Sequence, residues 1–190
     1  MKVSPEYIAE YRKAQSKVGD LAVKELTQVW KAQDLSRPEQ VRDALLEHVP
    51  GLTQKYGSAA AALAADWYDL TRADLGVMGR FMATVAPPFP AEGMVAQVRY
   101  GAAHLFTPTP EQTLEFLAGS VQKHSLQPAR ETIRQASLAD PAARGWQRIA
   151  SGTACEFCVM LEGRGAVYTE ESVAFDSHGH CHCTAVPVWD

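Results

Sequence analysis

The segments Cys155-Glu-Phe-Cys158 and His178-Gly-His-Cys-His-Cys183 decide how the end of this chain should fold. Together they contain all four cysteines and three of the six histidines among the 190 residues, and 19 residues separate them. A CxxC pair places two thiolates on one tight turn, where they can occupy two corners of a zinc tetrahedron. The second segment offers the other two corners, so the sequence predicts a structural zinc site.

Five side chains compete for the four positions of this site. The predicted ligands are Cys155, Cys158 and His178, and the tetrahedron is completed by either Cys181 or Cys183. The remaining thiol would lie beside the metal or pack as an ordinary side chain. Zinc is therefore the expected cofactor, in a structural role.

Two further histidines, His180 and His182, alternate with these cysteines. In such a run we expect both to face solvent rather than to bind the metal. A redox CxxC would normally open a helix that follows a strand, whereas Cys155 follows a stretch predicted to be helical. Four cysteines are also too few for a disulfide scaffold.

The beginning of the chain lacks an apolar segment long enough for a signal peptide or a membrane span. We therefore expect synthesis in a cytoplasm, where thiols stay reduced, and no membrane partner. The formal net charge is −4. Residues 1–148 carry 17 basic and 16 acidic side chains, and residues 149–190 carry only Arg164 against six acids. Neither part has the basic surface that nucleic-acid binding requires, so no specific nucleic-acid binding is predicted.

Helical periodicity dominates the first 148 residues. Apolar side chains recur every three to four positions over residues 5–33, which predicts one long amphipathic helix. Ser36-Arg-Pro-Glu39 has the form of a capping box and should open a short helix that stops near Pro50-Gly51. The alanine-rich residues 56–80 predict the central helix of a bundle.

Proline punctuates the next part of the chain. A helix is expected over residues 91–105, and Thr109-Pro-Glu-Gln112 reads as a second capping box that starts a helix ending near Lys123. Pro128 and Asp140-Pro141 are expected to open two more short helices.

The pattern changes near the cysteines. Arg164–Tyr168 and Thr184–Trp189 are short, rich in β-branched or aromatic residues, and bounded by turn residues, so they predict two strands, the second an edge strand because of Pro187. We thus predict a mainly α fold, with a multi-helix body of long amphipathic helices at residues 1–149 and a small zinc-stapled β element at 150–190. So short an element cannot bury a core of its own, and metal binding would offset that deficit.

Arginines are frequent just before the first cysteine pair. We interpret them as solvated side chains, with the C-terminal acids or an acidic partner as alternative contacts; they are Arg130, Arg134, Arg144 and Arg148.

Several motifs together resemble the MuF-like minor capsid (head morphogenesis) proteins of tailed phages, particularly those of actinobacterial hosts. The resemblance covers nearly the whole chain, and its most specific part is the block CxFCxML…RGxVY…HxxCxCxxxPV. The segments that carry it are Tyr56-Gly-Ser-Ala-Ala, Ala64-Ala-Asp-Trp-Tyr68, Asp140-Pro-Ala-Ala-Arg-Gly-Trp146-Gln-Arg148, Ala154-Cys-Glu-Phe-Cys158 through Tyr168, and His178 through Val188.

This resemblance implies a protein present in a few copies inside the virion, within the capsid, after synthesis in the host cytoplasm. Its partners would be the portal protein and other capsid proteins, with self-association as a further contact. Its role would lie in head morphogenesis, and co-ejection with the DNA stays open. The metal knuckle presumed for the family corresponds here to Cys155, Cys158, His178, Cys181 and Cys183.

Enzymatic alternatives fit the residues less well. A zinc deaminase needs an H-x-E motif and a proline before its CxxC, and the sequence has neither. Catalysis by a cysteine and a histidine suits this cluster less than metal ligation does. The main alternative is a zinc-stapled HNH-like nuclease, with His180 or His182 as the base, but the acidic C-terminal part would repel phosphates. A zinc-ribbon adaptor would be favoured by a basic face that the chain lacks. We therefore expect a structural protein and not an enzyme.

Overall fold

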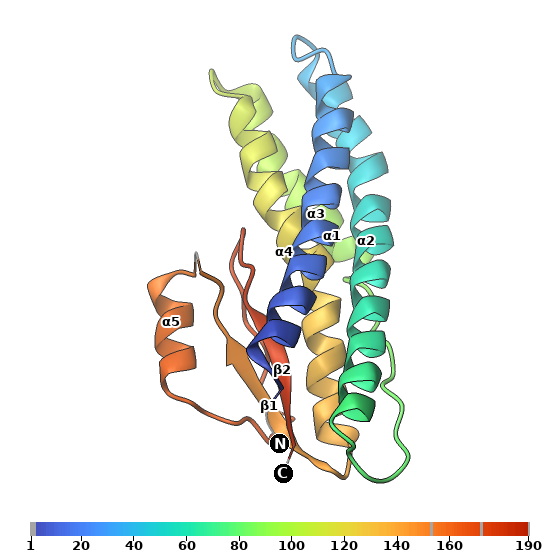
Figure 1. Cartoon of the computed structure of the whole chain (residues 1–190). Coiled ribbons are helices and arrows are strands. Elements are labelled where there is room, and N and C mark those ends of the chain that lie inside the picture. The colour runs from blue at the N-terminus through green and yellow to red at the C-terminus, as the bar shows by residue number, and fades with distance from the viewer. Residues whose placement is uncertain (1–2, 153, 172, 190) are drawn as a thin grey trace.

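A computed structural model describes residues 3–152, 154–171 and 173–189. The fold is mainly α, as predicted, with three long helices and a short two-stranded sheet (Figure 1). In chain order the elements are α1 (Pro5–Lys31), α2 (Pro38–Asp74), α3 (Ala91–Gly101), the 3-10 helix η1 (Ala102–Phe106), α4 (Glu111–Ala139), β1 (Ala143–Ile149), α5 (Glu156–Gly163) and β2 (Thr184–Trp189).

Helix α1 confirms the prediction from periodicity. Ser4 caps it by accepting a hydrogen bond from the backbone N–H of Tyr7, and Pro5 occupies the first turn, where its missing N–H costs nothing. One stripe of the helix is buried against α2 and α4, as the 3.6-residue period requires; it consists of Tyr11, Gln15, Gly19, Ala22, Leu26 and Trp30.

Helix α2 runs straight through the predicted stop at Pro50-Gly51 and ends at Asp74 rather than near residue 80. The prediction was wrong because Val49, Pro50 and Leu52 are all buried, and this packing outweighs the hydrogen bond that a proline removes. The first capping box does not form either. Arg37 occupies the N-cap, while Ser36 hydrogen-bonds to Asp34 in the preceding turn.

Helix α4 also differs from its prediction. It continues past Lys123 and through Pro128 to Ala139, and its N-cap is Pro110, so Thr109 does not form the second capping box. Thr132 donates its hydroxyl proton to the carbonyl oxygen of Pro128 at 2.8 Å. The buried face of α4 continues on both sides of the proline, which again explains why the helix does not break.

The residues after Asp140 form strand β1 instead of the predicted helix. β1 pairs antiparallel with β2, from Ile149 opposite Thr184 to Ala143 opposite Trp189. Strand β2 confirms its prediction, and both strands are edges of this sheet, which accommodates Pro187. The predicted strand at 164–168 is reduced to a single bridge between Tyr168 and Trp146.

Helix α5 was not predicted; it lies on the far side of the sheet from the long helices (Figure 1). The predicted boundary between residues 149 and 150 falls at the end of β1. The sheet therefore takes one strand from each side of this boundary, and β1 and β2 both contact α4.

The interior contains two apolar cores. The bundle-end core lies between α1, α2, α3 and α4 and consists of Ala22, Leu26, Trp30, Val41, Leu45, Val49, Leu52, Met94, Val98, Ala102, Leu105, Leu117 and Val121. The sheet-end core joins the other halves of α1, α2 and α4 to the sheet; its largest members are Tyr11, Tyr68, Ile133, Trp146, Phe175 and Trp189. The first and last described residues, Val3 and Trp189, both belong to this core.

A buried ion pair closes the sheet end. Asp140 accepts hydrogen bonds from Arg72 Nε at 2.8 Å, Tyr68 Oη at 3.1 Å and Trp189 Nε1 at 3.1 Å. The other guanidinium nitrogens of Arg72 donate to the backbone carbonyls of residues 77–79. One interior arginine thus links α2, the end of α4 and the loop that follows α2.

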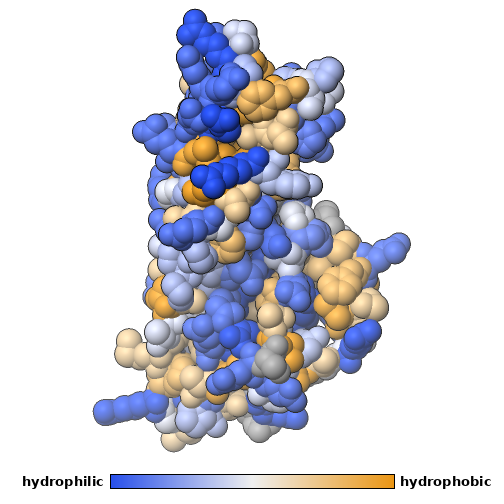
Figure 2. Space-filling model, turned by 180° about the vertical axis from the view of Figure 1, so that it is seen from behind, coloured by the Kyte–Doolittle hydropathy of each residue, from blue (hydrophilic) through white to orange (hydrophobic). Residues whose placement is uncertain are grey.

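On the face seen in Figure 2, apolar surface occurs in separate areas between hydrophilic ones. Helix α5 carries the half-exposed side chains Phe157, Val159 and Met160. Within the described residues, no helix has the length and apolar character needed to span a membrane.

Candidate metal centre

The pairing of β1 with β2 brings the two cysteine segments together. Ile149 lies opposite Thr184, so the chain leaving β1 and the chain entering β2 start side by side. Cys155 is the N-cap of α5 and Cys158 lies in its first turn, whereas Cys181 and Cys183 directly precede β2. The CxxC pair therefore opens a helix after a strand, and our expectation that it follows a helical stretch was wrong.

All five predicted ligands lie in one region, in two overlapping groups. The ligand atoms of Cys155, Cys158 and His178 lie within 4.8 Å of one another, and so do those of Cys158, Cys181 and Cys183. Cys158 belongs to both groups and is the centre of the arrangement. A tetrahedral site with metal–sulfur bonds of about 2.3 Å has its sulfur atoms about 3.8 Å apart, so small adjustments would close a site here.

Burial differs across the region. Cys158, Cys181 and Cys183 are buried, Cys155 is half-buried and His178 is exposed. All four cysteines are free thiols. We call these four residues the cysteine cluster. His178 lies at its outer edge, where its Nε2 is 3.0 Å from Cys155 Sγ.

The thiols differ in acidity. The hydrogen bond from the Cys183 thiol, assisted by the positive charge of Arg130, lowers the pKa of Cys181 to about 4. The pKa of Cys183 is raised in turn, because it donates that hydrogen bond and is buried. Burial raises the pKa of Cys158, whereas the backbone N–H of Cys158 lowers the pKa of Cys155. Of these two thiols, Cys181 is therefore the more acidic.

Two arginines that we expected in solvent are buried beside the cluster. Arg130 of α4 donates to the carbonyl oxygens of Cys181 at 2.6 Å and Cys183 at 3.1 Å. Arg148 of β1 donates to Cys158 Sγ at 3.7 Å and to the carbonyl oxygen of Asp176 at 2.7 Å. The sequence did contain a signal for Arg130, since it lies on the buried stripe of α4.

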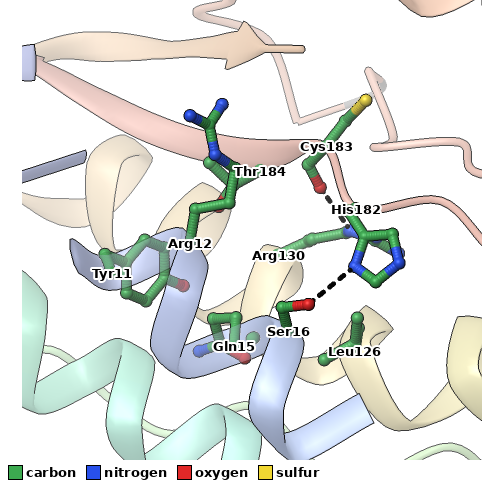
Figure 3. Close-up of a pocket in the computed structure, with 10 residues that line it drawn as sticks. Tyr11, Arg12, Gln15, Ser16, Leu126, Arg130, His182, Cys183 and Thr184 are labelled. Atoms are coloured by element: carbon green, nitrogen blue, oxygen red, sulfur yellow. Dashed lines mark hydrogen bonds between the residues drawn. The ribbon is translucent and has the colours of Figure 1, made fainter. Parts of the chain in front are cut away.

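The histidine-rich loop docks onto the helices (Figure 3). His182 is half-buried between α1 and α4, with Nδ1 3.1 Å from Ser16 Oγ and Nε2 2.7 Å from Gln122 Nε2. The prediction that it faces solvent was therefore wrong. His180 is exposed as expected, although its Nδ1 lies 3.2 Å from Gln122 Oε1.

The loop lies close to Gly119 on α4. A Cβ atom at this position would lie 2.9 Å from Nε2 of the exposed His180 ring, which would have to shift, and 3.5 Å from the Cα atom of Gly179, an ordinary van der Waals distance.

A metal ion fits this donor set. Soft thiolates and one imidazole suit zinc, and three of the five donors are shielded from water. An ion held here would tie the start of α5 to the start of β2 and so stabilise a segment with little regular structure. The arrangement is compatible with a structural metal.

Fold and cluster together define a mainly helical protein with a cysteine-rich, metal-compatible element at its C-terminal end. The profile of the VG15 protein family matches residues 2–190, and the chain belongs to this family of viral proteins. No curated protein and no solved structure matches the chain significantly.

Proposed function

We propose that this chain is a structural minor capsid protein of a tailed phage or prophage, of the MuF-like type, in which a zinc ion stabilises the C-terminal element. Four of the five predicted ligands would hold this ion; they are Cys155, Cys158, His178, Cys181 and Cys183. It acts in head morphogenesis, inside the capsid, in contact with the portal protein and other capsid proteins. The viral family and the motif resemblance support the setting. The observation that carries the structural role is the location of the cluster.

The cluster lies inside a joint between elements rather than in a cleft. Cys158, Cys181 and Cys183 are buried; Arg130 donates to the carbonyl oxygens of Cys181 and Cys183, and Arg148 donates to that of Asp176. A catalytic zinc keeps one position open for water or substrate, whereas a structural zinc is enclosed by four protein ligands. The enclosure of these thiols supports a structural zinc and a protein that is not an enzyme.

Its surface suits contacts with other proteins. Apolar side chains are exposed on α5 and on the loop after α2, where Met78 and Met82 are more than 80% exposed. Methionine adapts to irregular partner surfaces, and such residues are enriched in protein interfaces. These areas are the places where we expect the portal or another capsid protein to bind.

The nuclease alternative requires a histidine with a free ring nitrogen for a metal or a water molecule. Both ring nitrogens of His182 already lie within hydrogen-bond distance of Ser16 or Gln122, and Nδ1 of His180 faces Gln122. These contacts favour a docking role for His182 over a catalytic one.

The location is tested by protein analysis of purified virions. We expect the chain in DNA-filled heads, protected from added protease until the capsids are opened, and retained by immobilised portal protein from the same phage. A purified full-length chain should leave duplex and single-stranded DNA intact in the presence of magnesium, manganese or zinc. Absence from virions would overturn the capsid role. Cleavage that disappears when His180→Ala and His182→Ala are combined would establish the nuclease.

A further inference from the structure

Two buried cations flank the cysteine cluster. Arg130 is 3% exposed and Arg148 is 4% exposed, and both guanidinium groups lie against the ring of Phe175, at 5.2 Å and 3.7 Å from its centre. A charge held away from water is costly unless an opposite charge and hydrogen bonds compensate it.

Neither arginine forms an ion pair with a carboxylate of the described residues. By contrast, Arg72, the third buried arginine, has Asp140 as its partner at 2.8 Å. Arg130 and Arg148 instead reach carbonyl oxygens and one sulfur of the cluster. The groups nearby that can supply the missing negative charge are therefore the thiolates.

The charge of the centre depends on which groups bind the metal. A divalent ion with four thiolates has a net charge of −2, whereas three thiolates and one neutral imidazole leave −1. Two guanidinium groups balance the first arrangement and overcompensate the second. The pair of buried arginines therefore favours the four cysteines as ligands over a set that includes His178.

One hydrogen bond to sulfur points the same way. Arg148 Nη1 donates to Cys158 Sγ at 3.7 Å, and such a charged donor stabilises negative charge on the sulfur.

His178 is exposed, and its Nδ1 donates to the carbonyl oxygen of Gly179. Its Nε2 lies 3.0 Å from Cys155 Sγ, which is shorter than the separation of about 3.6 Å expected between a nitrogen and a sulfur bound to one zinc ion.

We propose that the centre is a tetrathiolate site formed by Cys155, Cys158, Cys181 and Cys183, and that Arg130 and Arg148 are positioning residues that neutralise its double negative charge. This inference rests on the proposed metal centre. It assigns His178 to the surroundings of the site, next to Cys155.

Cobalt(II) substitution in the full-length chain tests the ligand set, because the intensity of the sulfur-to-cobalt absorption reports the number of bound thiolates. We expect the spectrum of four thiolates in the natural sequence and an unchanged intensity in His178→Ala. Cys155→Ser should lower the intensity by about a quarter, since one of four cobalt–sulfur bonds is lost. A sulfur-to-cobalt intensity of only three thiolates in the natural sequence, together with a changed spectrum in His178→Ala, would overturn the assignment.

Zinc competition with a chelator tests the arginines. Arg148→Met and Arg130→Met should each weaken zinc binding by about 10- to 100-fold, the usual effect of residues that support metal ligands. The Lys variants should recover most of the affinity because they keep the charge. Arg134→Met is the matched control, since Arg134 lies on the same helix and pairs with Glu131 away from the cluster. If Arg130→Met fails to fold, Arg130→Lys and the Arg148 variants still decide the question.

The metal centre and its tetrathiolate ligand set can be refuted separately. A natural chain that binds neither zinc nor cobalt would refute the metal centre itself. Tight zinc binding that is lost in His178→Ala, or that is indifferent to both Arg→Met changes, would refute only the tetrathiolate and its charge balance.

Discussion

The two ends of the helical bundle bury different kinds of side chain. In the bundle-end core, helices meet through aliphatic and aromatic side chains such as Leu45, Met94 and Leu117. All four buried charged side chains among the described residues lie instead at the sheet end; they are Arg72, Arg130, Asp140 and Arg148. Burying apolar surface is favourable without any partner, whereas each buried charge needs one. The stability of the sheet end therefore depends on specific charged and hydrogen-bonding partners. The stability of the bundle end depends only on how well apolar side chains fill the space.

Removal of the metal should have the largest effect and should separate the two ends. Structural zinc contributes about 10–16 kcal/mol in small metal-binding elements. We expect a strong chelator to remove amide-exchange protection from about residue 150 onward, while amides around Leu45 and Leu117 stay protected. Equal loss of protection at both ends would show that the metal does not act locally. Because the cysteine thiols must lose their protons to bind the metal, the same loss of amide-exchange protection should appear as the pH is lowered.

Asp140→Ala should be the most damaging single substitution outside the cluster. It leaves Arg72 buried without its partner, which typically costs about 3–5 kcal/mol of unfolding free energy. The measurement is chemical denaturation of the zinc-loaded chain. Asp43→Ala, which removes an exposed ion pair with Arg42, should change stability by less than about 1 kcal/mol. Similar losses in both variants would contradict the distinction between the ends.

Acid should weaken the same ion pair. Burial raises the pKa of Asp140, but the hydrogen bonds from Arg72, Ala142 and Trp189 outweigh this and leave the pKa below its ordinary value. A carboxylate with a lowered pKa stabilises the fold above its ordinary pKa, and that stability is lost as the pH falls through the lowered one. In the Asp140→Ala variant, this acid-sensitive contribution to the unfolding free energy should be absent.

Leu45→Ala tests the bundle end. Leu45 is fully buried, and such truncations cost about 2–5 kcal/mol, depending on how far the cavity collapses. We expect zinc affinity to stay unchanged, because Leu45 belongs to the bundle-end core whereas the cysteines of the cluster belong to the sheet-end core. Leu70→Ala, at an exposed position of α2, is the control and should lie within about 0.5 kcal/mol of the natural chain. A change in zinc affinity in Leu45→Ala would mean that the ends are coupled.

His124→Phe should have the smallest effect, confined to pH dependence. The ring of His124 stacks on Phe89 at 3.8 Å, its Nδ1 has no partner among the described residues, and burial lowers its pKa to about 4. Since the unfolded chain takes up the proton near pH 6.5, stability should fall as the pH drops from about 6.5 to about 4. His124→Phe should reduce the slope of unfolding free energy against pH in this range. An unchanged slope would show that other groups cause the pH dependence.

The sequence predicted those features of the fold and the site that depend on local patterns. Periodicity identified α1, and cysteine and histidine spacing identified five side chains that the fold brings together. It failed at Pro50 and Pro128, where packing outweighs the local preference for a helix end. Strand β1 was missed because its identity depends on pairing with β2, about forty residues later in the chain.

The buried arginines were missed for a different reason. Arginine is almost never buried without a partner, so composition favours an exposed side chain. The partners of Arg130 are backbone carbonyls 51 and 53 residues away, which no local pattern reveals. Only its position on the stripe that contains Leu126 and Ile133 distinguished it.

Arg72 connects the exposed loop after α2 to the buried ion pair at the sheet end. Its guanidinium group holds the carbonyls of residues 77–79 while it is held itself by Asp140, so the outward direction of Met78 is set from inside the protein. Any event that disturbs Asp140, whether acid or detachment of Trp189 from the sheet end, releases the loop as well. A fluorophore attached at position 78 would therefore report the opening of the sheet end from a site outside both cores.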